Sequence, residues 1–145
     1  MAYAAWLAKI TQRPWRLPTD AEWERASQGT YGRSFPWGNH TTPSQTEECD
    51  IRVMMPVGSY PQEASHNGVQ DMVGLMYEWT DGTIPGYLQP KHAPVADTSV
   101  YLALRCGWWG YTAEYAHVAF IRACGFLPDA FTYDLGMRLA LAPGA

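Results

Sequence analysis

The residues with the widest chemical repertoire in this chain are its three cysteines, Cys49, Cys106 and Cys124. A thiolate can act as a nucleophile or a metal ligand, and two thiols can form a disulfide. The three cysteines form no Cys-x-x-Cys pair and no cysteine–histidine set with zinc spacing. Two interpretations remain open: one disulfide with one free thiol, or three reduced thiols.

Groups that could serve acid–base chemistry are scattered along the chain. Glu114 could act as a general acid, but we expect it to anchor the neighbouring backbone through hydrogen bonds. The acidic residues at 47, 48 and 50 are typical of a solvated loop. We expect structural or solvated roles for the four histidines, because none has an evident metal partner. They are His40, His66, His92 and His117. No serine-hydrolase, zinc-protease, phosphate-loop or dinucleotide-binding motif occurs.

The elements that must position these groups are two helices, a few short strands and long loops. Apolar residues at helical spacing predict a short amphipathic helix over residues 2–11, which ends before Arg13-Pro14. Thr19 and Glu22 form a capping-box pattern, which predicts a second helix from Asp20 to about residue 28. Strands are expected over residues 52–60 (up to a turn at 58–59), 72–80, 100–104 and 136–141. This pattern predicts an α+β fold, with the aromatic segment 35–38 fixing a long loop to the core.

Size and composition suit one domain over residues 1–145, because 47% of the residues are hydrophobic and a packed core can form. The net charge is −4 and no basic run occurs, which argues against a nucleic-acid partner. No segment approaches the ~20 apolar residues of a membrane span. The first residues lack the layout of a secretory signal, so the sequence leaves the localisation open. Seven Trp and nine Tyr are many for this length; buried aromatic residues account for some of them, and a contact surface would account for the rest.

The segment 104–140 combines two kinds of position, which we call frame and insert residues. The frame residues are Arg105, Gly107, Trp109, Ala113, Glu114, Ala116, His117, Val118, Ala119, Arg122, Pro128, Asp129, Leu135, Gly136 and Arg138. The insert residues are Trp108, Gly110, Tyr111, Thr112, Tyr115, Ala123, Cys124, Gly125, Phe126, Leu127, Ala130, Phe131, Thr132 and Tyr133. The insert residues show neither helical nor strand periodicity, as expected of a binding surface on a rigid scaffold. We expect the charged frame residues at 105, 122, 129 and 138 to form structural ion pairs or loop anchors, and Trp109 to lie in the core.

These pieces occur in an order that resembles the formylglycine-generating-enzyme (sulfatase-modifying factor) domain, a variant of the C-type lectin fold. The matching pieces are the frame residues, Gly74 and the segments 16–24, 36–39, 56–61, 67–72 and 78–80. The strands that usually precede the first helix of that family are absent or shortened here. The resemblance implies a single lectin-like domain with two helices, short antiparallel strands and long ordered loops.

Two departures from the family pattern bear on activity. The enzymes of that family oxidise a substrate cysteine with a pair of copper-binding cysteines, and the matching positions here fall at about Tyr111 and Ala116. Since neither residue binds copper, the resemblance implies a protein without that catalysis. The family's calcium-associated loop matches residues 74–79, but its asparagine is replaced by Leu75, and Glu78 alone is a poor ligand set. We therefore expect no bound cofactor or metal; calcium held through backbone carbonyls is the alternative.

The segment 104–140 also resembles a narrower group, the variable proteins of diversity-generating retroelements. In these proteins a mutagenic reverse transcriptase replaces template adenines, often at asparagine codons, and the frame ends in a motif like Leu135–Arg138. No asparagine follows Asn67, which fits such replacement, although Trp108 requires a different template codon. Cys106 stands where that group often has glycine. The resemblance implies a hypervariable ligand-binding region over 104–140. Its implied ligand-binding residues are Trp108, Gly110, Tyr111, Thr112, Tyr115, Ala123, Cys124, Phe126, Leu127, Ala130, Phe131, Thr132 and Tyr133.

The sequence thus favours a binding protein whose partner is a protein or another surface macromolecule. Two alternatives remain. The first is an enzyme or accessory subunit of the same family with a repurposed active-site face, which would show turnover or a bound metal. The second is a structural module that packs against other domains, whose aromatic patch would make the isolated chain self-associate.

Overall fold

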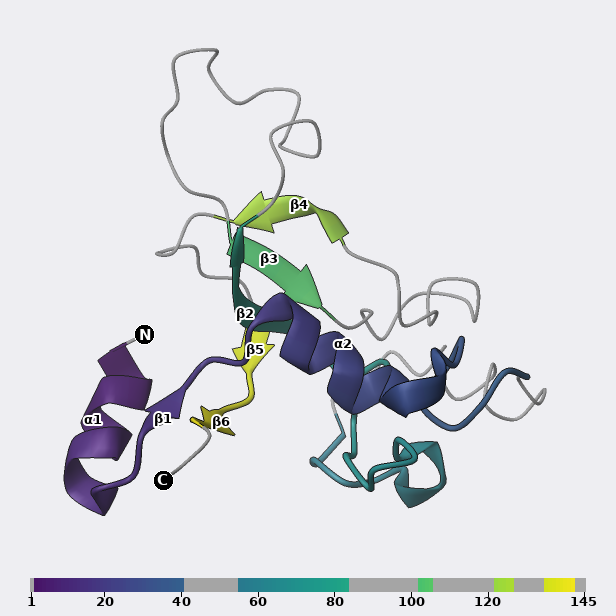
Figure 1. Cartoon of the computed structure of the whole chain (residues 1–145), viewed down its shortest axis with the longest axis horizontal. Helices are drawn as coiled ribbons and strands as arrows, with labels where there is room; N and C mark the ends of the chain where they lie inside the picture. Colours follow the sequence, from purple (N-terminus) through teal and green to yellow (C-terminus); the bar gives the residue numbers. More distant parts are fainter. Residues whose placement is uncertain (1, 41–54, 84–101, 106–121, 127–134, 143–145) are drawn as a thin grey trace, which may run out of the picture.

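The structure is a computed structural model, and it describes residues 2–40, 55–83, 102–105, 122–126 and 135–142 (Figure 1). For residues 122–126 it describes the backbone alone. Two small helices and two β-sheets make up this part of the chain. Among the described residues, no helix has the length and apolar character needed to cross a bilayer.

The two predicted helices are confirmed. Helix α1 spans Ala2–Thr11 and helix α2 spans Asp20–Gln28. The capping box of α2 is complete: the Glu22 amide donates to Thr19 Oγ1 at 3.2 Å, and the Thr19 amide donates to Glu22 Oε2 at 2.8 Å. Gly29 ends the helix with a φ of 67°, a conformation that glycine adopts without strain. A short 3-10 turn, η1, follows over Gly29–Tyr31.

The main sheet has four strands in the order β4-β3-β2-β5. They are β2 (Tyr77–Thr83), β3 (Leu102–Arg105), β4 (Arg122–Phe126) and β5 (Leu135–Met137). Strands β2, β3 and β4 pair antiparallel, whereas β5 runs parallel to β2, with Tyr77 opposite Leu135. The expected short antiparallel strands are present, and the sheet also contains one parallel pair, β2 with β5. Parallel neighbours need a long connection, and the chain between β2 and β5 provides it.

A second, two-stranded sheet joins the two ends of the chain. Strand β1 (Trp15–Arg16) pairs antiparallel with β6 (Ala140–Leu141). The prediction of one strand over 136–141 is wrong, because β5 and β6 belong to different sheets and Arg138 lies between them with its side chain bound to the main sheet. Neither β1 nor β4 was predicted; the first is two residues long, and the second lies among insert residues without strand periodicity.

Two further strand predictions need correction. Strand β2 begins at Tyr77 rather than at residue 72 and continues to Thr83, because Gly74 (φ 72°) and Leu75 (φ 58°) interrupt the extended path before it. Residues 55–60 contain no strand; they form the predicted turn around Gly58 (φ 77°) and lead into the 3-10 helix η2 (Pro61–Glu63). The remainder of the expected strand over 52–60 lies outside the described residues.

Helix α2 lies across the main sheet and supplies the centre of the core (Figure 1). Trp23 is 1% exposed and packs with buried Met72, while Ala26 and Val69 lie against this pair. The aromatic segment 35–38 also behaves as predicted: Pro36 is buried, and the rings of Phe35 and Trp37 stack with centroids 5.5 Å apart.

Candidate functional site

Three of the predicted ligand-binding residues lie on a described strand. Ala123, Cys124 and Phe126 belong to β4, one of the two outer strands of the main sheet as described, which pairs with β3. The remaining predicted ligand-binding residues lie outside the described residues. They are Trp108, Gly110, Tyr111, Thr112, Tyr115, Leu127, Ala130, Phe131, Thr132 and Tyr133. Also outside are Cys49, Cys106, Trp109, Glu114, Ala116, His92, His117 and Asp129. The binding surface as a whole therefore stays a prediction.

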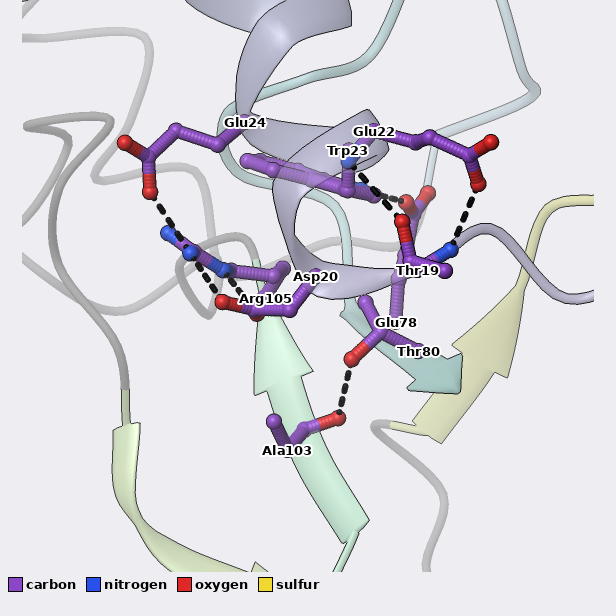
Figure 2. Close-up of polar contacts among 9 residues, drawn as sticks. All are labelled: Thr19, Asp20, Glu22, Trp23, Glu24, Glu78, Thr80, Ala103 and Arg105. Carbon is purple, nitrogen blue, oxygen red and sulfur yellow. Dashed lines mark hydrogen bonds and ion pairs between the residues drawn. The ribbon is translucent and has the colours of Figure 1, made fainter. Parts of the chain in front are cut away.

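The structure does define how the chain enters this segment, at Arg105 on β3 (Figure 2). The Arg105 side chain is 1% exposed and reaches Asp20 on α2, with Nε 2.5 Å from Oδ1. Its Nη2 donates to Glu24 Oε2 at 2.6 Å, and its guanidinium lies over the Trp23 ring. Burial lowers the pKa of Arg105, but the hydrogen bonds and charges of Asp20 and Glu24 outweigh this and raise it. Arg105 therefore stays charged and joins β3 to α2.

A second ion pair, between partly buried Arg138 and buried Glu78, holds the chain where it leaves the segment. Arg138 follows β5, and its guanidinium binds both oxygens of Glu78 on β2, with Nε to Oε2 at 2.5 Å and Nη2 to Oε1 at 2.7 Å. Glu78 Oε2 also accepts a hydrogen bond from Trp23 Nε1 at 2.6 Å. Arg138 Nη2 donates to the Asp71 carbonyl at 2.9 Å. Helix α2, strand β2 and the segment after β5 are thereby joined at one point.

Arg105 and Arg138 thus form structural ion pairs, as predicted from the frame. The side chain of Arg122 and the whole of Asp129 lie outside the description, so their predicted roles are not tested. The partner residues on α2 were not singled out as anchors. Their spacing carried a signal, because Asp20 and Glu24 are four residues apart and lie on one face of a helix.

Glu78, the described carboxylate of the loop 74–79 that matches the family's calcium-associated loop, is already engaged. Both carboxylate oxygens of Glu78 accept hydrogen bonds, from Arg138 and Trp23, so the one carboxylate of the calcium-like loop is part of an ion pair. In the described part of the chain, no three His, Cys, Asp or Glu side chains are grouped so that they could hold a metal ion. Positions 111 and 116, which match the copper-binding cysteines, lie outside it.

A shallow hollow runs along α2 beside the Arg105 ion pairs. Its lining includes Asp20, Glu24, Arg25 and Gln28. Asp20 and Glu24 are the carboxylates that bind Arg105. Because both carboxylates are engaged in ion pairs, we assign the hollow no acid–base chemistry.

Comparison with known proteins gives a family. Residues 1–143 match the model of the sulfatase-modifying factor enzyme 1-like domain. The chain is 30% identical over 159 residues to the inactive C-alpha-formylglycine-generating enzyme 2 of Mus musculus, a match that covers 99% of this chain and 46% of that protein. It is 37% identical over 95 residues to a hercynine oxygenase of Mycolicibacterium smegmatis, covering 59% of this chain and 21% of that enzyme.

Solved structures support the α+β fold. PvdO from Pseudomonas aeruginosa superposes with a TM-score of 0.74 at 22% identity, covering 97% of this chain and 57% of that one. Variable protein 1 of Treponema denticola superposes with a TM-score of 0.63 at 22% identity, covering 90% of this chain and 49% of that one. The chain spans about half the length of the curated relatives that it matches along its whole length. Because the family model covers nearly every residue, this chain belongs to the sulfatase-modifying factor enzyme 1-like domain family.

Proposed function

We propose that this chain is a ligand-binding protein without catalytic activity, which displays residues 104–140 as a variable surface diversified by a retroelement. The observation that carries the proposal is the pair of arginine anchors, of which Arg105 is buried and Arg138 is partly buried. Arg105 ties the start of the segment to α2, and Arg138 ties its end to Glu78 on β2. The anchors and their partners lie outside the insert positions, so their bonds persist when the insert residues change.

A binding surface that varies needs a fold whose stability comes from elsewhere. The described core is built from α2, β2 and β3, with Trp23, Tyr77 and Leu104 almost fully buried. None of these three is an insert residue. The aromatic insert residues, Trp108 and Tyr133 above all, would then supply large contact areas at low entropic cost. The partner we propose is a protein or another surface macromolecule.

The likeness to variable protein 1 of Treponema denticola supports this scaffold, and the inactive relative in mouse supports the absence of catalysis. The sequence adds that Tyr111 and Ala116 stand where the family's oxidases have copper-binding cysteines. These two positions therefore lack the pair of thiolate ligands with which the family's oxidases bind copper.

The gene itself provides the direct test. We would sequence the DNA around this gene in many clones and look for a near-copy of codons 104–140 that differs where the copy has adenine. The proposal predicts such a copy, with clones that vary at insert positions such as 111, 115, 126 and 133. One unvarying sequence and no copy would refute diversification.

A second test asks whether the insert residues stabilise the fold. We expect the combined variant Tyr111→Ser, Tyr115→Ser and Tyr133→Ser to unfold within about 2 °C of the unchanged chain, because exposed side chains contribute little to stability. The control is Leu104→Ala at a fully buried position, which should cost about 2–5 kcal/mol. A loss in the tyrosine variant as large as that of the control would place these side chains in the core and overturn the proposed surface.

The second candidate is an enzyme or accessory subunit, which the hercynine oxygenase and formylglycine-generating enzyme relatives favour. It predicts a bound metal and oxygen consumption with a thiol-containing peptide. Metal analysis of the purified chain and an oxygen-electrode assay distinguish it from the binding protein. Turnover would replace the first proposal, even if the unfolding temperatures agreed with it.

A further inference from the structure

Strand β2 contains a bulge at the point where helix α2 approaches the main sheet. In the pairing of β2 with β3 the register shifts between Trp79 and Thr83, so that residues 80–82 lie opposite the single residue Ala103. Extra residues of this kind bend a strand and redirect the neighbouring side chains, often beside a functional site. We call residues 80–82 the β2 bulge.

The β2 bulge is bonded to the structure on both of its sides. The hydroxyl of Thr80, a fully buried residue, donates to the Ala103 carbonyl at 3.0 Å and holds the bulge on β3 (Figure 2). The Asp81 amide donates to the Pro18 carbonyl at 2.8 Å and holds the bulge against the residues that lead into α2. The bulge therefore joins the start of α2 to the main sheet.

Gly82, the last residue of the β2 bulge, lies against the first turn of α2. A methyl group on Gly82 would place its carbon 2.9 Å from the Cβ atom of Asp20, whereas carbon atoms in contact are ordinarily about 3.5–4.0 Å apart. The Asp20 Cβ atom is bonded to the backbone of α2 and cannot turn aside, so the helix itself would have to move. The φ of Gly82 lies outside the left-handed region. Glycine is therefore needed at this position for space and not for its backbone conformation.

The position of Asp20 matters because this residue holds Arg105. Its two carboxylate oxygens accept hydrogen bonds of 2.5 Å from Nε and Nη2 of Arg105, the residue at which the chain enters the segment 104–140. A contact of 2.9 Å becomes an ordinary one only if the first turn of α2 moves by about 0.6 Å or more. Such a movement away from β3 would stretch both hydrogen bonds beyond the roughly 2.7–2.9 Å of a good ionic hydrogen bond.

We propose that Gly82 is a positioning residue for the binding segment 104–140. Because Gly82 has no side chain, α2 closes on the sheet and sets Asp20 against Arg105, which fixes the place where the segment begins. Gly82 lies outside the segment, so it would serve every version of the variable surface alike. The consequence for ligand binding rests on the proposed function, whereas the effect on Arg105 does not.

Nuclear magnetic resonance of the arginine side chains tests the proposal on the 145-residue chain. The Nε–H protons of Arg105 and Arg138 each donate to a carboxylate, so their exchange with solvent reports on the two anchors separately. We expect Gly82→Ala to speed the exchange of the Arg105 proton about tenfold or more, because a stretched hydrogen bond opens more often. The Arg138 proton should keep its rate, because Glu78 on β2 holds it rather than α2. The matched control is Gly38→Ala, whose methyl group would meet nothing within 4 Å and which should change neither proton.

A double-mutant cycle separates positioning from a general loss of stability. If Gly82→Ala has already displaced the carboxylate, Asp20→Asn should lower the unfolding temperature of that variant by less than half as much as it lowers that of the unchanged chain. Should Gly82→Ala fail to fold, Thr80→Val removes the hydrogen bond that holds the bulge on β3 without adding volume. This second variant should also speed the exchange of the Arg105 proton and leave the Arg138 proton unchanged.

Three results would overturn the proposal. The first is unchanged exchange at Arg105 in Gly82→Ala, or in Thr80→Val if only that variant folds. The second is equal acceleration at Arg105 and Arg138, which would show that the substitution loosens the whole fold. The third is an undiminished effect of Asp20→Asn in the double variant. A single unvarying gene sequence, by contrast, would refute the proposed variable surface and leave the positioning of Arg105 untouched.

Discussion

Two arginine–glutamate pairs in this fold have nearly the same geometry but different exposure. Together they test whether burial decides how much an ion pair contributes to the stability of the fold. Arg138 binds Glu78 through hydrogen bonds of 2.5 and 2.7 Å, and Arg16 binds Glu22 through hydrogen bonds of 2.6 and 2.7 Å. The side chains of the first pair are 23% and 11% exposed, and those of the second are 32% and 42% exposed. The perturbation we choose is the substitution of each glutamate by glutamine, which keeps its shape and removes its charge.

The expected losses of stability differ because water can hydrate the remaining arginine in only one of the two pairs. In Glu78→Gln the mostly buried guanidinium of Arg138 loses its counter-charge, and such a loss costs about 3 kcal/mol. The hydrogen bond from Trp23 Nε1 then ends on a neutral group, which adds roughly 0.5–1 kcal/mol. In Glu22→Gln the partly exposed Arg16 is rehydrated, and the glutamine still completes the capping box, so we expect a cost of less than about 1 kcal/mol.

Urea unfolding followed by circular dichroism measures both costs as changes in the free energy of unfolding, and thermal unfolding gives the matching changes in the unfolding temperature. For a chain of this size, about 3–4 kcal/mol corresponds to a fall of roughly 10 °C in the unfolding temperature, whereas the Glu22→Gln variant should change it by no more than about 3 °C. Equal losses in the two variants would refute the reasoning that burial decides the strength of these pairs. Such a result would also weaken the assignment of Glu78 and Arg138 as the anchor of the variable segment.

Three more predictions follow from local geometry. Leu75 has a left-handed backbone with a φ of 58°, so Leu75→Asn should be more stable than Leu75→Ala by about 1 kcal/mol in thermal unfolding. The hydrogen bonds from Arg16 and from the Thr19 backbone lower the pKa of Glu22 from 4.5 to about 2. A pKa that is lower in the folded state stabilises the fold above pH 4.5, and this stability is lost as the pH falls toward 2; unfolding of Glu22→Gln should lack that part of the acid loss. Thr19→Ala removes the side-chain half of the capping box and should cost about 1 kcal/mol, with Thr19→Ser as the near-neutral control.

Contrary results would be informative in each case. Equal stability of the asparagine and alanine variants at position 75 would mean that this backbone is not strained. An identical acid-unfolding profile for Glu22→Gln and the unchanged chain would show that the Arg16 pair does not hold in solution. A Thr19→Ala variant as stable as the Thr19→Ser control would show that the packing of Trp23, rather than the cap, holds the first turn of α2.

The sequence predicted the features that depend on residues close to one another along the chain. The capping box of α2, its end at Gly29 and the turn at Gly58 each involve residues a few positions apart, so residue type and spacing predicted them. The frame residues Arg105 and Arg138 were also predicted to form structural ion pairs or loop anchors. Their charge within an apolar, loop-rich segment makes an unpaired state costly, although the sequence did not identify their partners.

The tertiary structure alone decided which distant residues meet. Glu78 is 60 residues from Arg138 and 55 from Trp23, and Arg105 is 85 from Asp20, so no local pattern could pair them. The same holds for the strand partners. Local sequence does not say that β5 pairs with β2, or that residues 136–141 are divided between two sheets. Sequence periodicity marks apolar residues but does not say which of them are covered. The exposure of Tyr3, Trp6 and Ile10 on α1 was therefore decided only by the tertiary structure, because burial is set by what packs against a surface.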